Sequence, residues 1–161
     1  MVAGPVFHVD DLSGAAAQAL VARHLRGMHE NSPEDSCFAL DVERLRQPGV
    51  TFWTCWLEGQ LAGMGALKAL ASGDGEIKSM RVDDAFLGRG LGRAILDHIL
   101  AEAQARGMTR LWLETGSAPA FVPAIRMYET AGFERCGPFA DYRESAFSIF
   151  MMRALAPAVA A

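Results

Sequence analysis

The sequence is poor in cysteine and contains no disulfide or zinc-binding pattern. It holds three cysteines, Cys37, Cys55 and Cys136, an odd number without a Cys-x-x-Cys pair. A reducing cytoplasm is therefore the expected location. The chain also lacks the run of about eighteen apolar residues that a membrane helix needs, and its first residues lack the pattern of a signal peptide. A membrane is therefore not an expected partner.

An excess of basic residues is missing as well. The 161 residues carry a formal net charge of −4, whereas nucleic-acid-binding domains usually present a basic face, so nucleic acid is not an expected partner. No internal repeat is visible, and the 51% of hydrophobic residues is enough for a single core. We expect one domain over residues 1–153, followed by a loosely ordered tail over residues 154–161.

The most informative stretch is GEIKSMRVDDAFLGRGLGR, residues 75–93. Its first half has the residue types of a strand, and apolar residues at helical spacing follow it up to Gly107. Three glycines, at 88, 90 and 92, therefore lie just before a helix N-terminus, where free N–H groups and the helix dipole attract anions. Arg89 and Arg93 add positive charge. A phosphate or pyrophosphate site and a tight turn without a ligand are equally compatible with this segment alone.

Two common phosphate-binding motifs do not fit these glycines. A Walker loop needs Gly-Lys-Ser/Thr, but Gly92 is followed by Arg93 and Ala94. A dinucleotide fingerprint needs Gly-x-Gly-x-x-Gly, and the spacing 88, 90, 92 lacks the second gap of two residues.

The spacing instead resembles the acyl-CoA loop of the GNAT superfamily of N-acetyltransferases, Arg/Gln-x-x-Gly-x-Gly/Ala. Gly90 and Gly92 match its last two fixed positions, whereas Leu87 stands at the first. The segments LETGS, MYETAGF and GPFADYRESAFSIFM extend the resemblance over most of the chain from about residue 50, and together with GEIKSMRV they resemble a bacterial subgroup of small GNAT proteins. The resemblance implies transfer of an acetyl group from acetyl-CoA to a primary amine of a small molecule or peptide, by direct attack in a ternary complex and without a metal.

Strands are expected over residues 5–9, 50–57, 60–70, 76–82, 109–115, 133–136 and 146–152, and helices over 13–29, 38–46, 91–106 and 123–131. Residues 10–13 supply candidate caps for the first helix. The strand–helix–strand unit at 76–115 predicts a parallel pair, whereas the short turns before it predict antiparallel pairs. The expected fold is α/β (α+β): a GNAT-like mixed, largely antiparallel sheet with a central splayed parallel pair and helices on both faces.

The resemblance also implies which residues bind acetyl-CoA. Its pantetheine arm would lie between the two splayed strands, and its pyrophosphate would lie on the glycine loop. Phe121 stands where the superfamily often has asparagine, and Ala124 matches a small residue before the late tyrosine. The implied cofactor residues are Met80, Arg81, Val82, Leu87, Gly88, Arg89, Gly90, Leu91, Gly92, Arg93, Thr115, Phe121, Ala124 and Tyr128.

Two residues are candidates for catalysis. Tyr128 of MYETAGF would protonate the CoA sulfur by resemblance, and the alternative is a ring that only packs at the sheet edge. Glu76 is the predicted base, because some superfamily members carry a glutamate four residues before the position of Met80. Glu76, Lys78, Met80 and Val82 are expected on one strand face. The alternative is a surface pair of Glu76 with Lys78.

Candidate acceptor residues come from the early helices, the fifth expected strand and the late loop. Acidic groups among them would suit a cationic amine, although each also has a structural alternative. His24 and His29 are five residues apart, which does not place them together as metal ligands. The candidates are His24, His29, Glu30, Glu114, Asp141 and Tyr142.

Two other functions stay open at this stage. A non-catalytic CoA-binding sensor or regulatory module would keep the fold, and the departures at Leu87 and Phe121 favour it. A phosphate- or nucleotide-binding enzyme is the third interpretation. The superfamily often dimerises, so a homodimer is a possible assembly.

Overall fold

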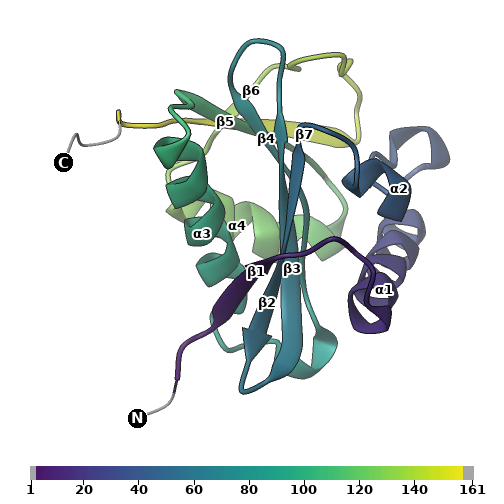
Figure 1. The fold of residues 1–161 in the computed structure, drawn as a ribbon. Helices are drawn as coiled ribbons and strands as arrows, with labels where there is room; N and C mark the ends of the chain where they lie inside the picture. The colour runs from purple at the N-terminus through teal and green to yellow at the C-terminus, as the bar shows by residue number, and fades with distance from the viewer. Residues whose placement is uncertain (1–2, 158–161) are drawn as a thin grey trace.

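The computed structural model describes residues 3–157, in which seven strands form one sheet in the order β1-β2-β3-β4-β5-β7-β6 (Figure 1). The strands are β1 (Val6–Val9), β2 (Val50–Leu57), β3 (Gln60–Ala69), β4 (Gly75–Val82), β5 (Arg110–Gly116), β6 (Glu134–Cys136) and β7 (Ser148–Ala154). The helices are α1 (Ala15–Asn31), α2 (Val42–Leu45), α3 (Leu91–Ala105) and α4 (Val122–Thr130).

All neighbouring strands pair antiparallel except β4 and β5, which α3 connects. Their parallel ladder contains only the pairs Gly75↔Leu111 and Glu76↔Trp112. Beyond Glu76 the two strands have no ladder between them. The predicted mixed sheet with a central splayed parallel pair is therefore confirmed.

Helices cover both faces of the sheet, as predicted. Figure 1 shows α3 and α4 on one side and α1 and α2 on the other. The alternation of side chains along each strand divides the core into two clusters. Trp53 and Leu67 pack in the cluster that holds α3, whereas Phe52 and Met64 pack in the cluster that holds α1.

The alternation along β4 is broken at Ser79. This residue has a φ of 56°, and the register with β3 shifts there, from Ala66↔Lys78 to Met64↔Arg81. The extra residue makes a β-bulge, which turns the following side chains to the opposite face. Glu76, Lys78 and Arg81 therefore share the α1 face, whereas Met80 and Val82 pack with the α3 cluster. The expectation that Glu76, Lys78, Met80 and Val82 share one face is wrong.

Three predicted boundaries also differ. Gly14, without a side-chain cap, precedes α1, because the preceding aspartates form turns with the N–H groups of Leu12 and Ser13. The second helix begins only after Asp41, whose carboxylate accepts the Arg44 N–H as an N-cap. The expected tail begins late, since Ala154 ends β7 and the Leu155 N–H donates to the Thr109 carbonyl at 2.8 Å. Residues 158–161 of that tail lie outside the described residues.

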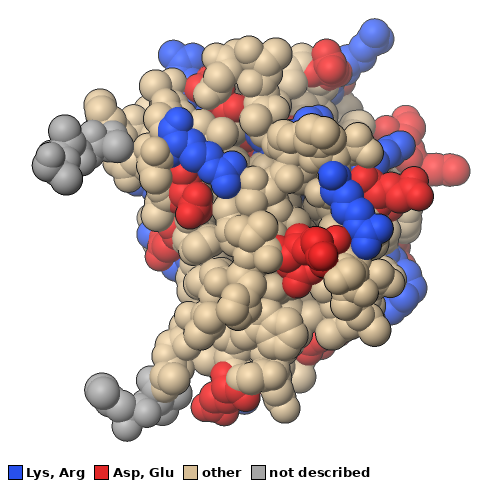
Figure 2. Space-filling view, in the orientation of Figure 1, with Lys and Arg blue, Asp and Glu red and all other residues tan. Residues whose placement is uncertain are grey.

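Charges are mixed on the surface. On the face that Figure 2 shows, basic and acidic side chains are interspersed over a largely uncharged surface. Along α3 two ion pairs have i,i+4 spacing, Arg93–Asp97 and Arg106–Glu102. No helix in residues 3–157 is both long and apolar enough to cross a membrane.

We expect Gly65→Ala to lower the free energy of unfolding by about 1–3 kcal/mol, the usual cost of overpacking a core. A Cβ at Gly65 would lie 2.8 Å from Ile95 Cγ2 and 2.9 Å from Ile99 Cδ1, because α3 packs directly on β3 at this point. Urea unfolding measures the change. Gly137→Ala is the matched control, since a Cβ there meets nothing within 4 Å. Equal losses in both variants would contradict the close packing of α3.

Candidate active site

The loop between β4 and α3 leaves the start of α3 open. Gly88 and Gly90 have φ values of 79° and 78°, a backbone region that glycine adopts without strain, and a Cβ at either position would meet nothing within 4 Å. Gly90 is the N-cap of α3 and supplies no side-chain hydrogen bond. The first N–H groups of α3 are therefore available to an anion, with the helix dipole behind them.

A cavity of about 550 Å³ lies beneath this loop, between α1, the end of β4 and α4. We call it the loop cavity. The fold brings most of the predicted cofactor residues together along its lining. They are Met80, Arg81, Val82, Leu87, Gly88, Gly90, Leu91, Gly92, Ala124 and Tyr128.

The two loop arginines are placed differently from the expectation. The Arg89 guanidinium lies 5.3 Å from the centre of the Phe86 ring, and Arg93 Nε donates to Asp97 Oδ1 at 2.9 Å. Neither residue lines the loop cavity. Nearby side chains engage both charges, which leaves the backbone N–H groups of the loop as the donors that are open to an anion.

A second, smaller cavity of about 230 Å³ lies where β4 and β5 diverge. We call it the sheet cavity. Thr115 and Phe121, two of the predicted cofactor residues, line it together with His24 and Glu114. The two cavities adjoin, because they share the lining residues Gly27, Asn31, Met80, Arg81, Ala120, Ala124 and Tyr128.

Tyr128 of α4 lies at this junction. Its side chain is buried, its ring packs edge-to-face against Phe133, and its hydroxyl lies 3.9 Å from Met80 Sδ. Burial raises the pKa of Tyr128 to about 12. The hydroxyl therefore keeps its proton near neutral pH and is a hydrogen-bond donor there.

Glu76 is buried within a complete polar cluster. Its Oε2 accepts hydrogen bonds from the Tyr142 hydroxyl at 2.5 Å and from Lys78 Nζ at 3.2 Å, and Lys78 Nζ also donates to the Tyr142 hydroxyl at 2.9 Å. Burial, followed by the charge of Glu76, raises the pKa of Tyr142. The cluster attaches the late loop to β4. Glu76 does not line either cavity, and its pair with Lys78 is buried rather than at the surface.

Glu114, on β5, lies in surroundings unlike those of Glu76. It lines the sheet cavity, and its Oε2 is buried without a hydrogen-bond partner among the described residues. Burial raises the pKa of Glu114 to about 7, the nearby Ser148 hydroxyl and Lys78 oppose the rise, and Glu76 adds to it. This carboxyl can therefore take up and release a proton near neutral pH.

Three further polar groups gather where α1 passes over β4. His24 is 7% exposed, its Nδ1 has no partner among the described residues, and burial followed by the charge of Arg81 lowers its pKa to about 4. The Ser79 Oγ at the bulge is likewise buried without a partner. Gly27 makes room for Arg81, since a Cβ there would lie 2.9 Å from Arg81 Nη1.

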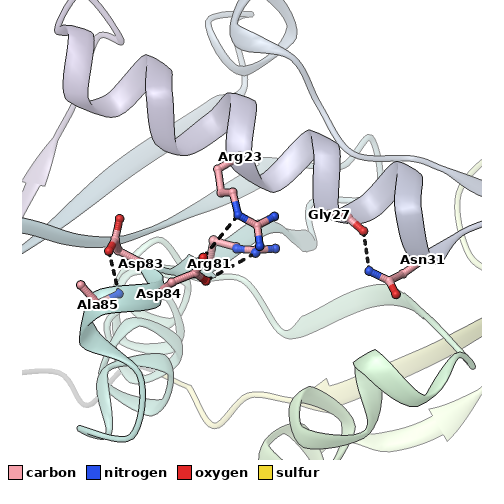
Figure 3. A network of polar contacts seen from close by, with 7 residues as sticks. All are labelled: Arg23, Gly27, Asn31, Arg81, Asp83, Asp84 and Ala85. Carbon is pink, nitrogen blue, oxygen red and sulfur yellow. Dashed lines mark hydrogen bonds and ion pairs between the residues drawn. The ribbon is translucent and has the colours of Figure 1, made fainter.

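Figure 3 shows the surroundings of Arg81 below α1. Arg23 Nε lies 3.3 Å from Asp84 Oδ2, whereas Arg81 Nη2 lies 3.9 Å from Asp84 Oδ1. Asp84 is thus closer to Arg23 than to Arg81. Burial, followed by the charge of Arg23, lowers the pKa of Arg81.

The predicted acceptor residues do not all reach the site. His24 and Glu114 line the sheet cavity and Glu30 lines the loop cavity. His29 lines neither cavity, and Asp141 lines a separate one beside Trp112 and Phe139. Tyr142 lines neither cavity, and its hydroxyl donates a hydrogen bond to Glu76 Oε2 instead.

Sequence patterns did not indicate the roles of Ser79 and Gly27. The bulge that exposes Ser79 to the sheet cavity depends on pairing with β3, which no local pattern reveals. Gly27 carried one weak signal: a helix-interior glycine on the same inward stripe as Leu20 and His24.

Known proteins are similar to this chain in sequence. The model of the acetyltransferase (GNAT) family matches residues 18–133. The uncharacterized N-acetyltransferase YsnE of Bacillus subtilis is 48% identical over 91% of this chain and 97% of its own. YedL of Escherichia coli, named likewise, is 51% identical over 88% of this chain and 89% of its own.

Solved structures are similar to this chain in fold. A crystal structure from Klebsiella pneumoniae, assigned to the acyl-CoA N-acyltransferases, has a TM-score of 0.76 and 26% identity, and the match covers 94% of this chain and 97% of that one. The loop cavity, with its open helix N-terminus and glycine loop, fits the acyl-CoA that this family uses. The chain therefore belongs to the GNAT family and is an acyl-CoA-dependent N-acetyltransferase.

Proposed function

We propose that this protein transfers the acetyl group of acetyl-CoA to a primary amine of a small molecule or peptide, by direct attack in a ternary complex. The observation that carries the proposal is the junction of the two cavities at Met80, Arg81, Ala124 and Tyr128. Donor and acceptor would enter from different cavities and meet at one point. Such positioning replaces an encounter in solution and removes the need for a covalent enzyme intermediate.

The fold supplies two sets of backbone donors for the cofactor. The glycine loop and the first turn of α3 would hold the pyrophosphate. Residues 77–82 of β4 have no strand partner on the β5 side, so their N–H groups there are free for the pantetheine arm and the thioester oxygen. Acetyl-CoA supplies a thioester, whose carbonyl carbon is attacked by the amine nitrogen while the carbon–sulfur bond breaks.

Glu114 is the base in this proposal. A lysine-like amine has a pKa near 10.4 and arrives protonated, so a group in the pocket must take a proton before attack. Glu114 lines the sheet cavity with a free carboxyl oxygen, whereas the Glu76 carboxylate is engaged by Lys78 and Tyr142. The geometry therefore favours Glu114 over Glu76, the base predicted from the sequence.

Tyr128 would act on the leaving group. Its hydroxyl, which stays protonated, would donate a hydrogen bond to the sulfur as the negative charge develops. The first proton of the ammonium group goes to Glu114, and the second ends on the departing sulfur. The products are an N-acetyl amine, the free thiol of CoA and one proton on Glu114.

A non-catalytic CoA-binding module is the alternative, and Leu87 is the feature that favours it. Its exposed apolar side chain, 63% accessible, replaces the superfamily's Arg or Gln at the loop. The buried, unpartnered Oε2 of Glu114 weighs against it, because a carboxyl with a raised pKa in a cavity suits proton transfer, which a sensor does not need. Release of free thiol from acetyl-CoA in the presence of an amine supports catalysis, whereas tight binding without release supports the sensor.

Gly90→Asp should raise the dissociation constant for acetyl-CoA by at least about tenfold relative to Gly90→Asn, because the added carboxylate repels the pyrophosphate at the N-terminus of α3. Both side chains tolerate the left-handed backbone, and both enter open space, so the pair isolates the charge. Calorimetric titration with acetyl-CoA measures the difference. Equal affinities would place the pyrophosphate elsewhere.

The wild-type kcat/KM for a charged amine should rise with pH up to about 7, where Glu114 becomes ionised, and then level off. Glu114→Gln should be slower by about 10²–10⁴-fold near pH 7, and its rate should keep rising toward the amine pKa near 10.4, since only free amine then reacts. Thiol release measured from pH 5 to pH 10 gives both profiles. Parallel profiles would exclude Glu114 as the base.

Two controls accompany this profile. Glu76→Gln should lose stability through its cluster but keep the levelling-off near pH 7. Glu114→Gln should become more stable relative to wild type as the pH rises from about 4.5 to about 7. The folded-state pKa of Glu114 lies above its ordinary value of 4.5, so ionisation in this range costs the wild type stability that it has at lower pH. Thermal unfolding at several pH values tests the sign.

Tyr128→Phe should lower kcat by about 10²-fold or more while acetyl-CoA affinity and the thermal midpoint change little, because the ring keeps its packing against Phe133 and only the donor is lost. Steady-state kinetics with a calorimetric titration separates the two effects. Wild-type turnover in this variant would make the tyrosine purely structural.

A further inference from the structure

We propose that the acceptor is a small zwitterion of the amino-acid type, which places its carboxylate on Arg81 and its amine at Glu114. This inference rests on the proposed acetyl transfer and names the substrate class of the same site. It adds a carboxylate to the cationic amine that acidic side chains would suit.

Arg81 is a cation with unused hydrogen-bond donors. Its guanidinium donates no hydrogen bond within residues 3–157, and its ion pair with Asp84 Oδ1 spans 3.9 Å. The side chain of Arg81 is only 21% exposed, whereas that of Asp84 is 60% exposed and lies closer to Arg23. A guanidinium has five N–H donors in a planar fork, and a carboxylate fits that fork with two parallel hydrogen bonds.

Two neutral groups line the same hollow as Arg81. His24 Nδ1 and Ser79 Oγ are both buried, both lack partners among the described residues, and both residues line the sheet cavity. Only 7% of the surface of His24 is exposed. Burying a polar atom without a partner is unfavourable, so two such atoms on residues of a cavity that Arg81 also lines indicate a polar ligand. A carboxylate could accept hydrogen bonds from His24, Ser79 and Arg81.

Of the side chains that line the sheet cavity, Lys78 and Arg81 are basic and Glu114 is acidic. The Lys78 ammonium is held by Glu76 and Tyr142. Arg81 and Glu114 are left as the groups able to engage a ligand's charges. They complement a molecule with one carboxylate and one ammonium. A polyamine would meet Arg81 with a like charge, and a peptide N-terminus lacks the neighbouring carboxylate.

The size of the cavity agrees with a small acceptor. Its volume of about 230 Å³ is below the roughly 300–1,000 Å³ that drug-sized ligands occupy. A molecule the size of one amino acid fits such a space. The bulge at Ser79 and the missing side chain at Gly27 both open it toward Arg81.

The experiment compares proteinogenic amino acids as free acids, as carboxamides and as decarboxylated amines, by thiol release from acetyl-CoA. We expect the best free acid to exceed its amide and its amine in kcat/KM. Arg81→Gln should lower kcat/KM for that acid by about 10- to 100-fold, mainly through KM, the loss expected for charge-assisted hydrogen bonds. The ratio of acid to amide should fall by the same factor.

Two further variants make the result specific. Arg81→Lys keeps the charge without the fork and should lie between wild type and Arg81→Gln; it also serves if the glutamine variant does not fold. Arg26→Gln is the matched control, since Arg26 is exposed on the same helix as Gly27 and lines neither cavity. Arg26→Gln should keep the wild-type ratio of kcat/KM for the acid to kcat/KM for the amide.

The outcomes that overturn the inference are distinct from a failure of acetyl transfer. Equal or better use of amides or decarboxylated amines overturns it while leaving the transferase in place. The inference is also overturned if Arg81→Gln loses acetyl-CoA affinity by the same factor as it loses kcat/KM for the free acid, because Arg81 would then bind a cofactor phosphate. Acetyl-CoA binding without thiol release by any free acid overturns it too. Absence of both binding and release would instead refute the proposed function.

Discussion

The early end of the β4–β5 ladder is the constraint on which the site depends. Two parallel pairs hold the strands together, and after Glu76 the backbone of β4 has no neighbour on that side. Buried backbone groups need partners, so an edge of this kind beside a cavity suits a ligand that completes its hydrogen bonds. The bulge at Ser79 follows at once and sends Met80 to one face and Arg81 to the other. One interruption of a sheet thus provides the cleft, its donors and the side chains on both walls.

Two carboxyls on neighbouring strands have been given different tasks by their surroundings. Glu76 has two hydrogen-bond donors, one of which is the buried cation of Lys78, and it ties the late loop to the sheet. Glu114 has a free oxygen, faces a cavity and has a pKa raised to about 7. Environment rather than residue type separates a structural carboxylate from one suited to proton transfer. The structural cluster also fixes Lys78, so its charge does not lower the pKa of Glu114 as far as a direct pair would.

Local chemistry explains which features could be predicted from the sequence. The glycine loop and α3 follow from positions that need a positive φ and from a 3.6-residue period, and the splayed pair follows from a strand–helix–strand order. The bulge at Ser79 depends on pairing with β3, so the faces of β4 were assigned wrongly beyond it. The resemblance favours Glu76 as the base, whereas the burial and partners that favour Glu114 in the proposal are tertiary properties, which no local pattern encodes. Arg89 packs on the ring of Phe86, and Arg93 donates to the carboxylate of Asp97. The glycine motif does not encode these contacts.

Gly27 shows how a pocket can be shaped by a missing side chain in its wall. A glycine inside a helix costs about 0.5–1 kcal/mol relative to alanine, yet here alanine would press against the Arg81 guanidinium. The turn of α1 that passes over the two cavities therefore contains a glycine in place of a better helix former. A side chain at this single helix position would narrow the space beside Arg81 without altering the sequence of the glycine loop. Relatives that keep the same sheet and loop could thus differ in the room that α1 leaves at the junction of the two cavities.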